Sequence, residues 1–181
     1  MRILKYFGIA LGVIVLAVAG VAAYAAATQP DSFRVSRSLD ISAPPEKIYS
    51  ILSDFRRSPE WSPYEKLDPD MKRTHSGAAA GKGAGYAWDG DSNAGAGRME
   101  IVEATPAQSV TLKLDFIRPF EGSNTVEYKL QPNGSATRVS WDMHGPMPFI
   151  SKVICVFVDL DTMIGKDFET GLANLKTLAE K

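Results

Sequence analysis

A long uncharged segment near the N-terminus divides the chain into two parts. Residues 6–27 contain no charged residue and consist almost entirely of Ala, Val, Leu, Ile and Gly. A helix needs roughly 20 apolar residues to cross the hydrocarbon core of a bilayer. A buried core helix explains the segment poorly, because no polar face interrupts it. We therefore expect residues 1–30 to form an N-terminal membrane segment and residues 31–181 to form one domain.

The charges that flank this segment predict its orientation. Arg2 and Lys5 precede it, and the first acidic residue is Asp31. Positive flanks favour the cytoplasmic side, which places the following domain across the membrane. Small residues at 23–27 also fit a signal-peptidase site, so a cleaved signal peptide is the alternative. We favour a single-pass anchor in the inner membrane because the run exceeds the usual signal core of about 7–15 residues. Both interpretations place the domain on the extracytoplasmic side.

Composition excludes several classes of protein. The formal net charge of the chain is −1, and no basic patch supports nucleic-acid binding. Cys155 is the only cysteine, so an intramolecular disulfide is impossible. The two histidines, His75 and His144, are too scattered for a zinc site, and we expect no metal and no cofactor.

Alternation of apolar and polar residues predicts a set of short strands. In residues 33–41, one face carries apolar side chains and a single exception, Arg37. Residues 132–135 have the composition of a hairpin turn. The predicted strands are residues 33–41, 71–76, 85–89, 94–102, 110–116, 124–130 and 137–143.

Helical spacing appears before and after these strands. A Pro-rich start at residues 42–46 leads into a short helix, and a second short helix or turn covers residues 55–64. From Phe149 onward one apolar stripe predicts a helix of about 30 residues. An antiparallel sheet must bury one face, and this helix is its only long amphipathic partner. The predicted fold is α+β: a curved antiparallel sheet of about seven strands wrapped around a long C-terminal helix, plus one N-terminal transmembrane helix.

The order of these elements and several short stretches resemble the START-like (SRPBCC) superfamily. Within it, the chain is most similar to the polyketide cyclase/dehydrase and lipid-transport family, over about residues 32–181. The resemblance rests on residues 43–49 (APPEKIY), 59–64 (PEWSPY), 83–88 (GAGYAW) with 95–99 (GAGRM), and 168–176 (FETGLANLK). It implies a helix-grip fold with a hydrophobic cavity between the sheet and the last helix. The membrane segment is an addition to the usual soluble pattern of the family.

Large apolar side chains at inward positions are the candidate ligand-binding residues. A ligand cavity is lined mainly by such side chains, with a few polar groups that orient the ligand. An ordinary packed core would use the same residues. The candidates are Trp61, Trp88, Phe116, Tyr128, Trp141, Met143, Phe157 and Met163.

Catalytic chemistry has little support in the sequence. His144 directly follows a predicted strand and is the one, weak, candidate proton carrier, and an exposed or hydrogen-bonded loop histidine is the simpler interpretation. The glycine-rich residues 81–85 lack the Gly-Lys-Ser/Thr ending of a phosphate loop. No Ser-His-Asp order or Gly-x-Ser-x-Gly motif is present.

The expected function is therefore binding of a hydrophobic small molecule or lipid by a membrane-anchored domain. The alternative is a cyclase- or dehydratase-type enzyme that acts on an apolar substrate in the same cavity. A pre-organised cavity can accelerate a cyclisation by positioning alone, so absent motifs do not exclude this alternative.

Overall fold

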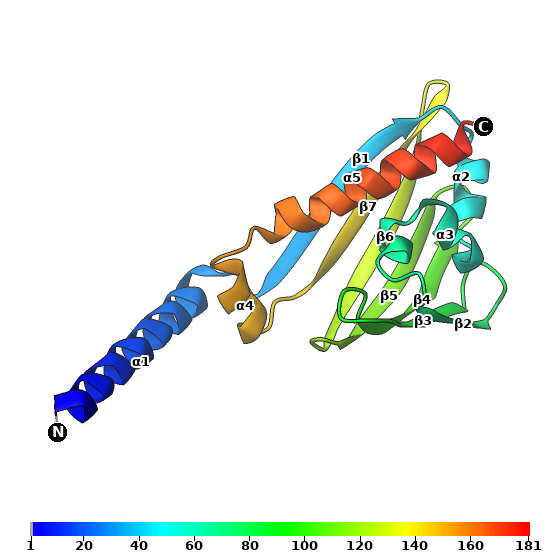
Figure 1. Ribbon diagram of the computed structural model, residues 1–181. Helices are drawn as coiled ribbons and strands as arrows, with labels where there is room; N and C mark the ends of the chain where they lie inside the picture. Colours follow the sequence, from blue (N-terminus) through cyan, green and yellow to red (C-terminus); the bar gives the residue numbers. More distant parts are fainter. Residues whose placement is uncertain (1) are drawn as a thin grey trace.

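The computed structural model describes residues 2–181, apart from the side chains of residues 2–5 and 7–11. A long first helix leads away from an α+β domain, as Figure 1 shows. The helices are α1 (Arg2–Thr28), α2 (Pro45–Leu52), η1 (Phe55–Arg57), α3 (Ser58–Trp61), η2 (Pro63–Lys66), α4 (Phe149–Cys155) and α5 (Leu160–Ala179). The strands are β1 (Ser32–Ile41), β2 (Lys72–Gly77), β3 (Ala84–Asp89), β4 (Ala96–Thr105), β5 (Ser109–Arg118), β6 (Gly122–Asn133) and β7 (Ala136–Pro146).

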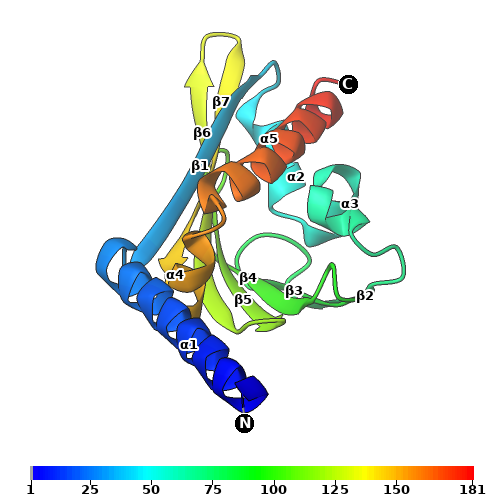
Figure 2. The same cartoon turned by 60° about the vertical axis from the view of Figure 1, so that its left-hand side comes forward.

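The seven strands form one antiparallel sheet in the order β1-β7-β6-β5-β4-β3-β2. The sheet curves around α5, and Figure 2 shows its β2–β3 edge turning toward the helices. The predicted number of strands and the antiparallel arrangement are confirmed. The predicted turn at residues 132–135 is also confirmed, since Asn133 pairs with Ala136 across the β6–β7 hairpin.

Three helices cover the concave face of the sheet. Helix α5 packs along β1 and β7, while α2 packs on β5 and β6, and α3 contacts α5. The apolar stripe of α5 is fully buried at Phe168, Leu172 and Leu175. The predicted pairing of sheet and C-terminal helix is therefore confirmed.

The prediction of one continuous helix from Phe149 is wrong. Helix α4 ends at Cys155, and α5 begins at Leu160 after a short connection. Asp159 ends this connection, because its Oδ1 accepts hydrogen bonds from the backbone nitrogens of Asp161 (3.1 Å) and Thr162 (3.3 Å). Such an N-cap satisfies amides that have no partner in the first turn of a helix. The carboxylate thus starts a new helix where the apolar pattern alone runs on.

The predicted transmembrane segment, residues 6–27, lies on α1, and its side chains at residues 7–11 lie outside the described residues. Among the residues that the structure describes, no helix is long and apolar enough to span a membrane. The C-terminal end of α1 contacts the domain through α4. Ala25, near that end, is fully buried.

Candidate ligand-binding site

A pocket of about 530 Å³, open to solvent, lies at the end of the sheet where α1 meets the domain. It is bounded by the start of β1, the segment before it and the connection between α4 and α5. Its lining residues are Gln29, Pro30, Ser32, Phe33, Arg34, Val35, Met147, Cys155, Val156, Phe157, Val158, Asp159, Leu160 and Asp161.

Two contacts hold the walls of this pocket in place. The backbone nitrogen of Met147 donates to the carbonyl oxygen of Asp31 (2.8 Å), which ties the end of β7 to the segment before β1. Lys152 Nζ on α4 lies 2.6 Å from Asp31 Oδ1, and this ion pair lowers the pKa of Asp31, first through the hydrogen bond. Both contacts meet at one residue, so Asp31 joins the strand β7, the helix α4 and the entrance to β1.

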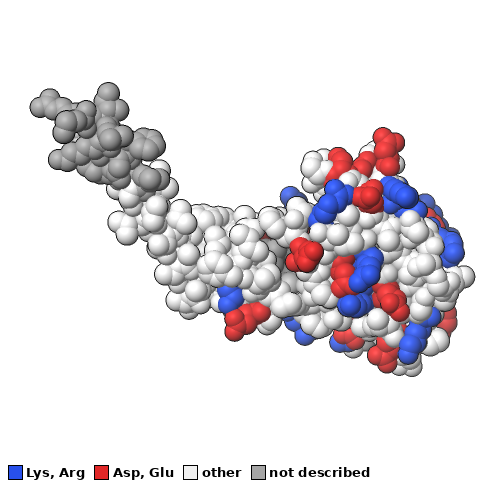
Figure 3. Space-filling view, turned by 90° about the horizontal axis from the view of Figure 1, so that it is seen from below, with Lys and Arg blue, Asp and Glu red and all other residues white. Residues whose placement is uncertain are grey.

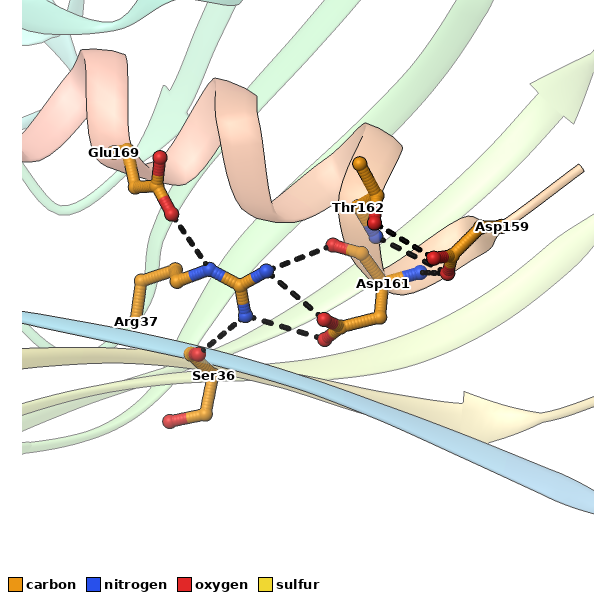
Figure 4. Close-up of polar contacts among 6 residues, drawn as sticks. All are labelled: Ser36, Arg37, Asp159, Asp161, Thr162 and Glu169. Atoms are coloured by element: carbon orange, nitrogen blue, oxygen red, sulfur yellow. Dashed lines mark hydrogen bonds and ion pairs between the residues drawn. The ribbon is translucent and has the colours of Figure 1, made fainter.

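The polar residue on the inner face of β1, Arg37, binds Asp161, one of the residues that line the pocket. In Figure 4 its guanidinium lies between β1 and the first turns of α5. Arg37 Nη2 donates to Asp161 Oδ2 (2.9 Å) and to the Asp161 carbonyl oxygen (3.0 Å), and Nε donates to Glu169 Oε1 (2.9 Å). These hydrogen bonds, first that with Asp161, raise the pKa of Arg37. Gly165 makes room for the guanidinium, because a Cβ at that position would lie 1.9 Å from Arg37 Nη2.

Deeper under α5, aromatic side chains fill the space between helix and sheet. Trp141 of β7 stacks on Phe168 of α5 with ring centroids 4.1 Å apart. Trp61 of α3 contacts Trp141 edge-on at 5.4 Å, and Tyr128 of β6 lies 5.2 Å from Trp141. Burial raises the pKa of Tyr128. These four side chains form the aromatic cluster of the core.

Two polar atoms of the aromatic cluster have no hydrogen-bond partner among the described residues. They are the indole nitrogens of Trp61 and Trp141, and both side chains are buried. A buried donor without a partner costs about 1–3 kcal/mol. The aromatic cluster therefore contains two N–H groups that are able to donate to an acceptor.

A separate group of polar side chains, centred on Glu65, lies at the β2–β3 edge of the sheet. The carboxylate of Glu65 is buried; Tyr86 Oη donates to its Oε1 (2.6 Å) and Arg73 Nε donates to its Oε2 (2.7 Å). Burial, followed by the hydrogen bond to Glu65, raises the pKa of Tyr86. Both carboxylate oxygens are occupied, so the charge of Glu65 is balanced inside the protein.

The candidate residues predicted from the sequence lie in different parts of the structure. Trp61, Tyr128 and Trp141 come together in the aromatic cluster. Trp88 and Phe116 meet edge-on at 6.0 Å on β3 and β5, where Trp88 Nε1 donates to the Ala94 carbonyl oxygen.

The other candidates lie outside the aromatic cluster. Met143 is buried on β7, Phe157 is exposed and lines the pocket, and Met163 is exposed on α5. His144 is exposed, follows the inward-facing Met143, and borders a smaller hollow with Arg34. Ligand binding by these residues and catalysis by His144 stay predictions.

Several pocket residues were not among the candidates from sequence. Phe33 and Val35 belong to the predicted inner face of β1, so their alternation was a usable signal. Met147 and Leu160 were harder to predict, because they line the pocket only as a result of the break between α4 and α5.

Comparison with known proteins identifies relatives of this domain. Residues 32–180 match the family described as polyketide cyclase / dehydrase and lipid transport. No curated protein sequence matches the chain significantly.

Several solved structures share the fold. A protein of Chromobacterium violaceum superposes with a TM-score of 0.57 at 17% identity, covering 84% of this chain and 99% of that protein. The Aha1 dimer of Colwellia psychrerythraea gives a TM-score of 0.58 at 17% identity, with 82% and 96% covered. A major latex-like protein of Panax ginseng gives 0.57 at 13% identity, with 84% and 100% covered. At these identities the likeness establishes the fold alone.

Proposed function

Because residues 32–180 match it, the chain belongs to the polyketide cyclase/dehydrase and lipid-transport family, and we propose that it binds a hydrophobic small molecule or lipid. The pocket between β1 and the α4–α5 connection carries this proposal. Its volume of about 530 Å³ lies in the range of about 300–1,000 Å³ that is usual for small-molecule sites. Phe33, Val35 and Leu160 offer apolar contact, and Arg34 and Asp161 offer polar groups at the rim.

The composition of the pocket supports an amphipathic ligand. Apolar side chains contribute most of the binding energy at such sites, whereas a few polar groups set the orientation of the ligand. Arg34 and Asp161, which line the pocket, supply such polar groups. A ligand with a long apolar part and one polar group matches this lining.

We propose further that the N-terminal segment anchors the domain in the inner membrane, with the domain on the extracytoplasmic side. The support is the uncharged residues 6–27, preceded by Arg2 and Lys5. Cell fractionation and the mass of the intact chain test this part. A membrane fraction that carries the whole chain supports the anchor, whereas a soluble form that lacks the first residues would identify a cleaved signal peptide.

Photo-crosslinking tests ligand binding at the pocket. The full-length chain, in vesicles that contain a diazirine fatty acid, is irradiated and its labelled peptides are mapped. We expect labelling within residues 29–35 and 147–161. Leu160→Trp fills the pocket and should lower this labelling roughly tenfold, equivalent to about 1.4 kcal/mol.

Met163→Trp is the matched control, because Met163 is exposed on the same helix and does not line the pocket. It should label like the wild type. Equal labelling of Leu160→Trp and wild type would contradict the proposed site.

A further inference from the structure

Helix α4 and the turn that follows it expose apolar side chains that no part of the described domain covers. No residue of α4 is buried. Phe149 at its start is 55% exposed, and Phe157 in the turn is 73% exposed. We call residues 149–158 the α4 patch. Its exposed large apolar residues are Phe149, Ile150, Ile154, Phe157 and Val158.

The α4 patch carries almost no net charge at its surface. Residues 149–158 contain no acidic residue and one basic residue, Lys152. Lys152 is itself largely covered and pairs with Asp31 at 2.6 Å. In Figure 3 the charged residues gather on the part of the domain distant from the first helix, and the surface nearer that helix is mostly uncharged. The patch is therefore apolar with its single charge neutralised, which is unusual for a surface that faces only water.

The α4 patch lies next to α1, which also exposes apolar side chains. Helix α4 contacts α1, and Ala25 is buried near this contact. On α1, the described side chains Val13, Leu16 and Val18 are exposed and apolar. Because the two helices are in contact, we expect the exposed side of α1 and the α4 patch to face the same medium.

We propose that the α4 patch lies in the interfacial layer of a phospholipid bilayer, so that the pocket opens against the membrane surface. This inference rests on the proposed anchoring by α1. Given that anchoring, the contact between α1 and α4 places α4 at the membrane surface. Phenylalanine and aliphatic side chains on a short surface helix then bury themselves at the boundary between head groups and acyl chains. Val156, Phe157 and Val158 line the pocket as well, so a lipid acyl chain would enter the pocket beside the turn that contacts the bilayer.

Cys155 allows a direct test, because it is the only cysteine of the chain and ends α4. The full-length protein is labelled with an NBD fluorophore at Cys155 and reconstituted into vesicles of phosphatidylcholine and phosphatidylglycerol. Fluorescence is then quenched from two sides. One quencher is a pair of phosphatidylcholines that carry a nitroxide near the head-group end or near the terminal end of the acyl chain, and the other is iodide in the water.

Two control probes complete the experiment, each in the Cys155→Ser background. Val18→Cys reports on α1, and Asn133→Cys reports on the β6–β7 turn at the far end of the sheet from α4 (Figure 1). We expect the nitroxide lipids to quench the probes at positions 18 and 155 several-fold more than the probe at position 133. Iodide should quench only the probe at position 133 strongly.

The outcomes separate this inference from the anchoring on which it rests. If the lipids quench position 18 while iodide quenches position 155, the anchor stands and the membrane contact of the α4 patch is refuted. If iodide quenches position 18, the anchor itself fails, and the inference fails with it. If neither quencher reaches position 155 while the lipids reach position 18, protein and not the bilayer covers this position, which also overturns the inference.

Discussion

The Nη2 atom of Arg37 on β1 lies 2.9 Å from Oδ2 of Asp161 in the first turn of α5. The same guanidinium reaches Glu169 two turns further along the helix. One side chain thus holds the start of α5 against the edge strand through Asp161, which lines the pocket. Screening by salt should weaken such partly exposed ion pairs, so the packing of the start of α5 on β1 should depend on ionic strength.

Removing Arg37 should loosen the start of α5 without unfolding its buried end. In Arg37→Ala, we expect faster amide hydrogen exchange in residues 160–166 and unchanged exchange in residues 172–179, which the core protects. Hydrogen exchange followed by mass spectrometry measures this. Arg138→Ala is the control, because Arg138 pairs with Asp40 at the other end of β1. Equal increases of exchange in residues 160–166 in both variants would show that Arg37 does not specifically stabilise the start of α5.

Gly165 and Arg37 should be energetically coupled. In the wild type, a Cβ at residue 165 meets Arg37 Nη2, so Gly165→Ala must displace the guanidinium. In the Arg37→Ala background this obstacle is gone, and alanine should stabilise the helix by about 1 kcal/mol relative to glycine. Urea unfolding of the four variants forms the double-mutant cycle. Additive free energies of unfolding would contradict the coupling.

The buried and the exposed Glu–Arg pairs should differ in their contribution to stability. Glu65 is buried, and Glu65→Gln removes the charge that pairs with Arg73. We expect a loss of about 1–3 kcal/mol in the free energy of unfolding. Glu60→Gln breaks the more exposed pair with Arg57 and should cost less than about 1 kcal/mol. Chemical denaturation of both variants measures the difference. A larger loss of unfolding free energy in Glu60→Gln than in Glu65→Gln would contradict the prediction that the buried pair contributes more to stability.

Stability should fall in alkaline solution because burial raises the pKa of Tyr128 well above the ordinary tyrosine value of 10.0. Above pH 10 the unfolded chain loses the phenolic proton while the folded chain keeps it, so unfolding becomes easier as pH rises. Each such tyrosine contributes about 1.4 kcal/mol per pH unit in this range. Tyr128→Phe should therefore flatten the decline of the unfolding free energy above pH 10. An equally steep decline in Tyr128→Phe and the wild type would contradict the prediction.

Local patterns in the sequence predict much of the fold. The alternation in residues 33–41 places Val35 and Ile41 in the core, because the side-chain period of a strand is local and independent of its partners. The apolar stripe of α5 likewise predicts the burial of Phe168 and Leu172. The break before α5 escaped this reasoning because apolar residues continue through Phe157 and hide the cap at Asp159.

The candidate site was harder to predict because it depends on contacts between distant segments. The hydrogen bonds of Arg73 and Tyr86 to Glu65 depend on the pairing of β2 with β3, which brings both donors to one carboxylate. The pocket forms where the start of β1 meets the α4–α5 connection, more than 100 residues later in the chain. Arg37 was visible as a charged residue on an apolar face, and its partners on α5 explain that exception.

The strand order has a consequence for how the chain matures. Within the described part of the chain β1 pairs with β7 alone, and β2 occupies the opposite edge of the sheet. The first strand to leave the ribosome must therefore wait, unpaired, until nearly the whole polypeptide has been made. Pairing between segments so far apart in sequence slows folding, and until it forms the unpaired backbone groups of β1 are prone to aggregation. This edge is covered only when β7 has formed beside it.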